Sequence, residues 1–209
     1  NLPYATNALV GGKPFDRPEV AQISASWHPI LLEVIQANPE IRATDPELIQ
    51  GIIQNTPRVL EIKAERLFQT IGRRITVLPP DARHVDYDII PLNISDGCVY
   101  KCRFCAVKNP IPFSARPMAR IQEQIESLRD LYGDDLVNYN SLMLGEHDAL
   151  HAPDDLIIQS VKSAFEQFEF DRSILQGKHL FMFGSTASLL EKSDVFFNRL
   201  NRLGCSTYI

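Results

Sequence analysis

Cys98, Cys102 and Cys105 form a C-x3-C-x2-C run, with Gly97 directly before the first cysteine and Phe104 directly before the last. Each iron of a cubane iron–sulfur cluster takes one cysteine sulfur, so three thiolates can hold three of its irons. A fourth ligand would be expected nearby, and the sequence around the run supplies none. The spacing therefore predicts a [4Fe-4S] cluster with one iron open to a ligand that is not protein.

Two other uses of these cysteines stay open. Structural zinc sites usually combine a C-x2-C pair with a second pair of Cys or His, and only Cys102 and Cys105 form such a pair. A plain electron-transfer cluster is the other alternative. A disulfide framework is not expected in a chain of 209 residues with 4 cysteines and no secretory signal. The fourth cysteine, Cys205, lies far downstream, and we expect a small buried core thiol there.

The run from Ser95 to Cys105 resembles the cluster loop of the radical S-adenosylmethionine (radical SAM) enzymes, C-x3-C-x-aromatic-C. The resemblance implies that Cys98, Cys102 and Cys105 are the metal ligands and that the open iron binds the amino and carboxylate groups of SAM. It also implies reductive cleavage of SAM to methionine and a 5′-deoxyadenosyl radical, which abstracts a hydrogen atom from a substrate that the sequence does not identify. The electron would come from a reductant such as a flavodoxin or a ferredoxin.

The same resemblance implies further contacts to SAM. Phe104 would lie by the adenine, although packing of the loop is the simpler alternative. Gly145 and Glu146 resemble the family's second motif, in which a glutamate meets the SAM ammonium, as a carboxylate can; Leu144 stands where the family often has another glycine. Ser185 could reach the ribose or cap a turn. His147 and Asp148, directly after Glu146, could together serve acid–base work on the substrate or cap a turn, so catalytic residues stay unassigned.

Alternating strands and helices must position these residues. Runs such as Leu180 to Phe183 are apolar on both faces, as expected of strands covered on both sides. We predict strands at 87–93, 141–144, 179–183 and 206–209, and helices at 117–131, 153–168 and 193–203. The alternation predicts right-handed βαβ units and parallel strands adjacent in chain order. Since ligands bind at the carboxyl ends of such strands, all the polar motifs should lie at one end of the sheet.

The predicted fold class is α/β: a partial parallel (β/α) barrel of the radical SAM type, with its first three to four βα units present, and a helical N-terminal region. Residues 1–85 are expected to form an irregular arm and helices, and residues 86–209 the partial barrel, truncated at its C-terminus because its fourth strand has nothing after it. In the first part we expect helices at 29–37, 45–53 and 56–71, and a short strand at 74–78.

Composition limits the classes of partner. The formal net charge is −5, so no basic field for nucleic acid is indicated. No apolar run approaches the ~20 residues of a transmembrane helix, and no signal peptide is recognisable at the start. We therefore expect a cytoplasmic protein without a membrane partner.

Overall fold

The computed structural model describes residues 18–71, 88–100, 111–145 and 148–209. The chain divides into two compact units, residues 1–66 and residues 67–209. The predicted boundary at residue 85 and the predicted strand at 74–78 both lie outside the described residues. We call the two parts the helical unit and the sheet unit and describe each by itself.

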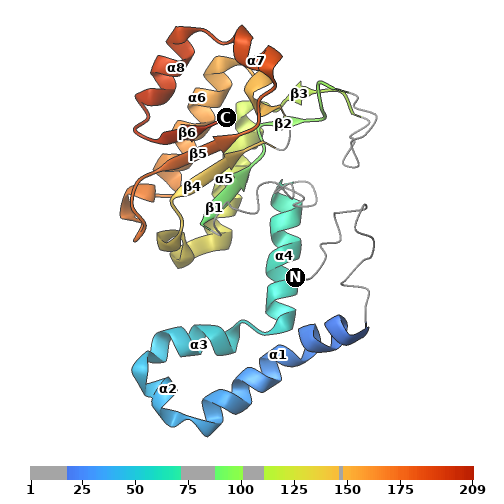
Figure 1. Cartoon of the computed structure of the whole chain (residues 1–209), viewed down its shortest axis with the longest axis vertical. Helices are drawn as coiled ribbons and strands as arrows, with labels where there is room; N and C mark the ends of the chain where they lie inside the picture. Colours follow the sequence, from blue (N-terminus) through green and yellow to red (C-terminus); the bar gives the residue numbers. More distant parts are fainter. Residues whose placement is uncertain (1–17, 72–87, 101–110, 146–147) are drawn as a thin grey trace. The chain divides into compact units, whose positions relative to one another are not determined.

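Four helices make up the described part of the helical unit, the last of which continues into the sheet unit (Figure 1). They are α1 (Pro18–Ala37), α2 (Pro39–Thr44), α3 (Pro46–Gln54) and α4 (Pro57–Ile71). Each begins with a proline, whose fixed φ suits the first turn and whose missing N–H is not needed there. The predicted caps are confirmed, since Asp45 accepts a hydrogen bond from the Leu48 N–H at 3.0 Å and Thr56 accepts one from the Val59 N–H at 3.3 Å.

The predicted start of α1 at residue 29 is wrong, because the helix begins at Pro18 and contains Pro29. An internal proline removes one helical hydrogen bond, here the bond to the Ala25 carbonyl. Both residues are exposed, so water can satisfy the released carbonyl oxygen. The short helix α2 was not predicted either.

As far as it is described, the sheet unit is built on four parallel strands in the order β1-β4-β5-β6. They are β1 (Ile89–Leu92), β4 (Ser141–Leu144), β5 (His179–Met182) and β6 (Ser206–Tyr208). Strand positions, direction and order agree with the prediction. The α/β class is thus confirmed, while the closer assignment to a partial radical SAM barrel stays a prediction.

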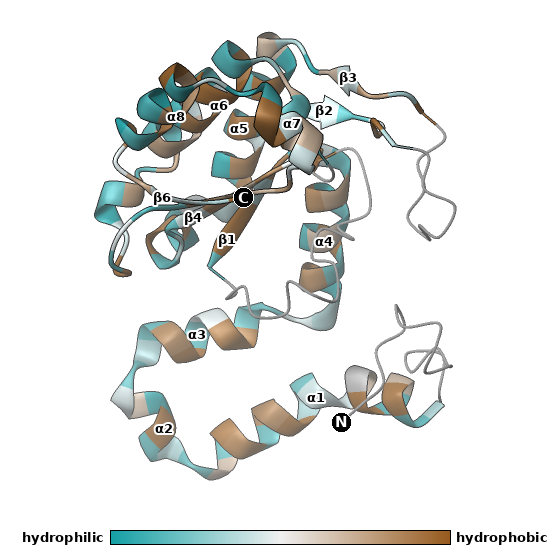
Figure 2. Ribbon diagram, turned by 45° about the horizontal axis from the view of Figure 1, so that its top comes forward, coloured by the Kyte–Doolittle hydropathy of each residue, from teal (hydrophilic) through white to brown (hydrophobic). Residues whose placement is uncertain are grey.

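Helices α5 (Met118–Tyr132), α6 (Asp154–Gln167) and α8 (Asp194–Asn201) cover one face of this sheet (Figures 1 and 2). Two rows of buried side chains cross the sheet and pack against the buried side of these helices. One row is Ile90, Leu142 and Leu180; the other is Leu92, Leu144 and Met182. Because both rows belong to one continuous core, the ends of the strands are fixed relative to one another.

Shorter elements complete the sheet unit. An additional helix, α7 (Thr186–Glu191), precedes α8 and was not predicted. A two-stranded antiparallel pair, β2 (Ser95–Asp96) with β3 (Ser114–Ala115), was not predicted either. Within the described part of this unit, 3-10 helices follow α5, β4 and α6: η3 (Gly133–Asn138), η4 (Ala149–His151) and η5 (Phe170–Arg172).

Among the described residues, no helix is both long enough and apolar enough to cross a bilayer.

Candidate functional site at the carboxyl end of the sheet

The turn that leaves β4 is bonded directly to the last residue of β1 at the carboxyl end of the sheet. The Gly145 N–H donates to the Leu92 carbonyl at 2.8 Å. Gly145 has a φ of 78°, and a Cβ there would lie 2.6 Å from the Cβ of Ala149. This turn therefore requires glycine, for reasons of both backbone conformation and space. Gly145 lies where the sequence predicted it, and Glu146 lies outside the described residues.

The loop that carries the cysteines is closed at its base by β2 and β3. Beyond this pair, the Cys98 N–H donates to the Ile111 carbonyl at 3.2 Å, and Cys98 forms a bridge with Pro112. Gly97 has a φ of 75°, and a Cβ at this position would collide with the Pro112 carbonyl. The glycine before the first cysteine thus allows two chain segments to meet closely.

An arginine that is largely shielded from solvent, Arg116, holds this base in place. The Arg116 guanidinium binds both carboxylate oxygens of Asp96, at 3.0 Å and 2.7 Å, and also donates to the Ile71 carbonyl at 3.2 Å. Its side chain is only 14% exposed. Such a fork-to-carboxylate pair is stronger and more directional than a single ion pair. It connects β2, the residue after β3 and the last turn of α4 within the sheet unit.

Cys98 is the one predicted cluster ligand that the structure describes. It is a half-buried free thiol, and its Sγ accepts a hydrogen bond from the Tyr100 N–H at 3.4 Å. Cluster-ligating sulfurs characteristically receive such N–H donors, which tune the potential of the iron. Cys102, Phe104 and Cys105 lie outside the described residues. Within the described residues no three His, Cys, Asp or Glu side chains are grouped so that they could hold a metal ion.

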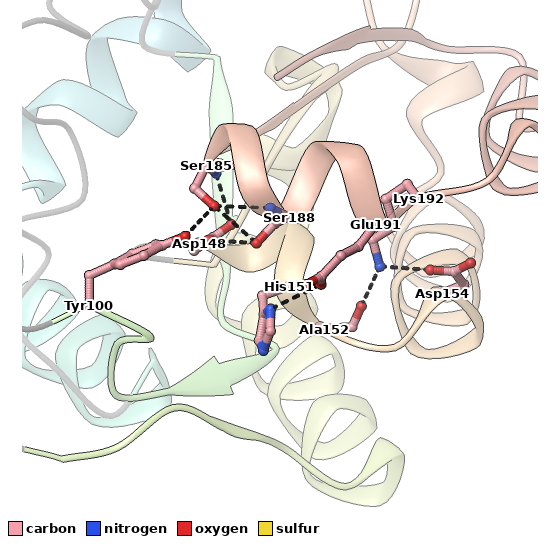
Figure 3. Close-up of polar contacts among 9 residues, drawn as sticks. All are labelled: Tyr100, Asp148, His151, Ala152, Asp154, Ser185, Ser188, Glu191 and Lys192. Atoms are coloured by element: carbon pink, nitrogen blue, oxygen red, sulfur yellow. Dashed lines mark hydrogen bonds and ion pairs between the residues drawn. The ribbon is translucent and has the colours of Figure 1, made fainter.

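A chain of hydrogen bonds joins the cysteine loop to the loops after β4 and β5 (Figure 3). The Tyr100 hydroxyl donates to Ser185 Oγ at 2.8 Å, and Ser185 Oγ lies 3.1 Å from Ser188 Oγ. Ser188 Oγ in turn donates to Asp148 Oδ2 at 2.7 Å, while Asp148 Oδ1 accepts the Ser185 N–H at 3.1 Å. Three sequence segments that are far apart therefore meet at one end of the sheet, as predicted.

Ser185 also caps α7, since its Oγ accepts the Ser188 N–H at 3.1 Å. The turn-capping alternative for Ser185 is thus confirmed. Its contact with a ribose stays a prediction. Asp148 is buried, at 6% exposure, and acts here as an acceptor for α7.

A second group of contacts lies at the other end of α7 (Figure 3). Lys192 binds Asp154 at 2.6 Å and the Ala152 carbonyl at 2.7 Å. His151 lies 3.7 Å from the Glu191 carboxylate, and its ring meets Phe113 edge to face at 5.0 Å. Because Phe113 directly precedes β3, this contact links the base of the cysteine loop to η4.

Cys205 is separate from this site. Its side chain is half-buried, packs against the core and lies 3.8 Å from the Thr207 hydroxyl. Burial raises the pKa of the Cys205 thiol. A raised pKa keeps the group a neutral thiol, which is a poor metal ligand. The expected core role agrees with this position, although the side chain is less buried than predicted.

Sequence reasoning missed two residues of the hydrogen-bonded chain, Tyr100 and Ser188, and left the role of Asp148 open. The S-x-x-S spacing of Ser185 and Ser188 at the start of a helix was the available signal, since serine is a frequent cap. No local pattern marks Tyr100, whose partner is 85 positions away.

No protein-family model, curated protein or solved structure matches this chain.

Proposed function

We propose that this chain belongs to a radical SAM enzyme that holds a [4Fe-4S] cluster with Cys98, Cys102 and Cys105. The observation that carries the proposal is the C-x3-C-x2-C run together with its position in the fold. Its first cysteine, Gly145 and Ser185 lie at the carboxyl end of one parallel sheet. Parallel α/β folds bind their ligands at that end.

The described residues fit a cluster in two respects. Cys98 is a half-buried free thiol, and its sulfur already receives the Tyr100 N–H, as a ligating thiolate would. Gly97 and Gly145 allow close approach of the backbone at the two turns that border the site. When bound, the cluster and SAM would supply one-electron cleavage of the sulfonium and hydrogen-atom abstraction from the substrate.

The protein would contribute binding and orientation. Gly145 would bring Glu146 to the SAM ammonium, and Phe104 would lie beside the adenine. Asp148, Ser188 and Ser185 would hold the start of α7 against the cysteine loop. The proposal requires a one-electron reductant such as a flavodoxin or a ferredoxin, and a cytoplasmic location, which suits an oxygen-sensitive group.

Anaerobic reconstitution with iron and sulfide tests the proposal. The wild-type chain should bind four irons, whereas Cys98→Ala, Cys102→Ala and Cys105→Ala should each lose most of them. Cys205→Ala is the matched control and should bind as much iron as the wild type. With dithionite and SAM, the reconstituted protein should release methionine and 5′-deoxyadenosine.

Two results would replace the proposal with one of its alternatives. A colourless protein that holds zinc through the same cysteines would indicate a structural zinc site. A protein that holds iron and sulfide but neither binds nor cleaves SAM would indicate an electron-transfer cluster. Full iron content in Cys102→Ala would contradict both the proposal and the predicted ligand set.

A further inference from the structure

Tyr100 makes two hydrogen bonds, one from its backbone and one from its side chain, to different parts of the site. Its backbone N–H donates to Cys98 Sγ at 3.4 Å, and its phenol donates to Ser185 Oγ at 2.8 Å. The first contact lies within the cysteine loop, and the second reaches the loop after β5. One residue therefore connects a predicted cluster ligand to the end of the sheet.

The hydrogen bonds from Tyr100 through Ser185 and Ser188 to Asp148 all run in the same direction, which Asp148 sets as the last acceptor. Ser188 Oγ donates its one hydrogen to Asp148 Oδ2, so it can only accept from Ser185, and Ser185 Oγ in turn accepts from the Tyr100 hydroxyl. Aligned hydrogen bonds of this kind polarise and strengthen one another. Asp148 itself is buried and also receives the Ser185 N–H. The phenol thus binds to a preorganised acceptor.

The exposure of Tyr100 separates this role from ordinary packing. Tyr100 is 41% exposed. A phenol on the surface can satisfy its hydroxyl with water, so burial does not require its bond to Ser185. The bond serves to link the cysteine loop to the start of α7 through two side chains.

We propose that Tyr100 is a positioning residue: held by Ser185, Ser188 and Asp148, its phenol fixes the Tyr100 N–H on the Cys98 sulfur and so sets the position and the electronic environment of that ligand. The part that concerns the cluster rests on the proposed function. The part that concerns the hydrogen-bonded chain does not, and can be measured on the metal-free protein.

The first experiment measures amide hydrogen exchange by NMR in reduced, metal-free protein. Tyr100→Phe removes only the hydroxyl, and Ser185→Ala removes its acceptor. In both variants the amides of Cys98 and Tyr100 should exchange about fivefold faster, the factor expected for the loss of one net hydrogen bond. Ser185→Thr keeps a hydroxyl and should restore slow exchange. Tyr139→Phe, at the opposite end of the sheet, is the matched control and should leave both amides unchanged.

The second experiment measures the midpoint potential and the rate of cluster loss to a chelator in reconstituted protein. Hydrogen bonds to the sulfurs favour the reduced cluster, so Tyr100→Phe and Ser185→Ala should shift the potential to more negative values and accelerate cluster loss several-fold. Tyr139→Phe should change neither quantity. A purely structural tyrosine would not move the potential of a cluster that is still fully loaded.

The outcomes distinguish the two claims. Unchanged exchange at Cys98 and Tyr100 in Tyr100→Phe would overturn the positioning role, whatever the protein does with iron. Faster exchange with an unchanged potential in loaded protein would overturn the electronic part. Faster exchange in a protein that takes up no iron would support the hydrogen-bonded chain and reject the proposed function.

Discussion

The two units of the chain hold their elements together in different ways. In the helical unit the described buried side chains are few, namely His28, Ile35 and Ile49, and Ile23 in α1 is 68% exposed. Figure 2 shows apolar segments on α1, α2 and α3. In the sheet unit a continuous core includes six strand residues and the inner faces of α5, α6 and α8. The helical unit is therefore specified mainly by local signals, and the sheet unit by long-range packing.

This difference predicts different responses to substitution. The stability of the helical unit comes from separate contributions, which should be lost one at a time. They include the prolines at the helix starts, the Asp45 cap and the bond from His28 Nε2 to the Ile53 carbonyl. In the sheet unit each core side chain touches several elements, so its loss should be felt cooperatively. The single tryptophan of the chain, Trp27, lies in α1, and its fluorescence therefore reports on the helical unit alone.

The largest difference is expected from truncation of a core side chain. Ile125→Ala, in α5, should lower the free energy of unfolding by about 2–5 kcal/mol, because it leaves a cavity in a close-packed interior. Ile49→Ala, in α3, should cost about 1 kcal/mol, the usual cost of a point substitution. Urea denaturation followed by circular dichroism and by Trp27 fluorescence measures both. Equal losses would show that the helical unit contains a core of its own and would end the comparison.

An intermediate difference is expected between two arginines. Arg116→Ala removes two hydrogen bonds to Asp96 and one to the Ile71 carbonyl, and should cost about 1.5–3 kcal/mol. Arg58→Ala, in α4, breaks an exposed pair with Glu61 and should cost about 0–0.5 kcal/mol. Denaturation at low and high salt checks the cause, since only the exposed pair should be screened. A loss at Arg58 as large as that at Arg116 would contradict the assignment.

The smallest effects concern two glycines, whose replacement by alanine should change the free energy of unfolding in opposite directions in the two units. Gly145→Ala places a side chain at positive φ against Ala149 and should destabilise the sheet unit by about 1–2 kcal/mol. Gly51→Ala, inside α3 with open space around it, should stabilise the helical unit by about 0.5–1 kcal/mol. Thermal unfolding resolves both changes. Stabilisation by Gly145→Ala would mean that the turn after β4 tolerates a side chain.

The elements that the sequence predicted are those with a strong local signal. Apolar runs marked the first three strands of the parallel sheet, and the helix end at Gly204 marked the start of the fourth. Asp45, Thr56 and Ser193 marked the starts of α3, α4 and α8. The missed elements lack such a signal. Pro29 suggested a boundary where α1 continues, and α7 is too short to show a period. Strands β2 and β3 contain two residues each and are defined by their pairing, which a local pattern does not encode.

The residues of the candidate site also fall into those that a local sequence signal marks and those that it does not. Gly145 and Ser185 follow predicted strands, so the rule for parallel sheets placed both at one end. Cys98 followed from its spacing in the cysteine run. The connection between them could not be predicted, because Tyr100, Ser188 and Asp148 meet only once the strands are paired. Their types are common in loops, and their function depends on distances of about 3 Å that only the fold establishes.

The strand order of the sheet also has a consequence for how the chain assembles during synthesis. Among the described strands, each later one adds beside the one made before it, so none has to enter between two that are already paired. At about 5–20 residues per second on the ribosome, successive strands emerge seconds apart. The sheet can therefore grow outward from β1 as translation proceeds, and at each stage the most recent strand forms the edge to which the next strand is added. Tyr100 emerges well before Ser185, so the hydrogen bond between them can form only after β5 has left the ribosome.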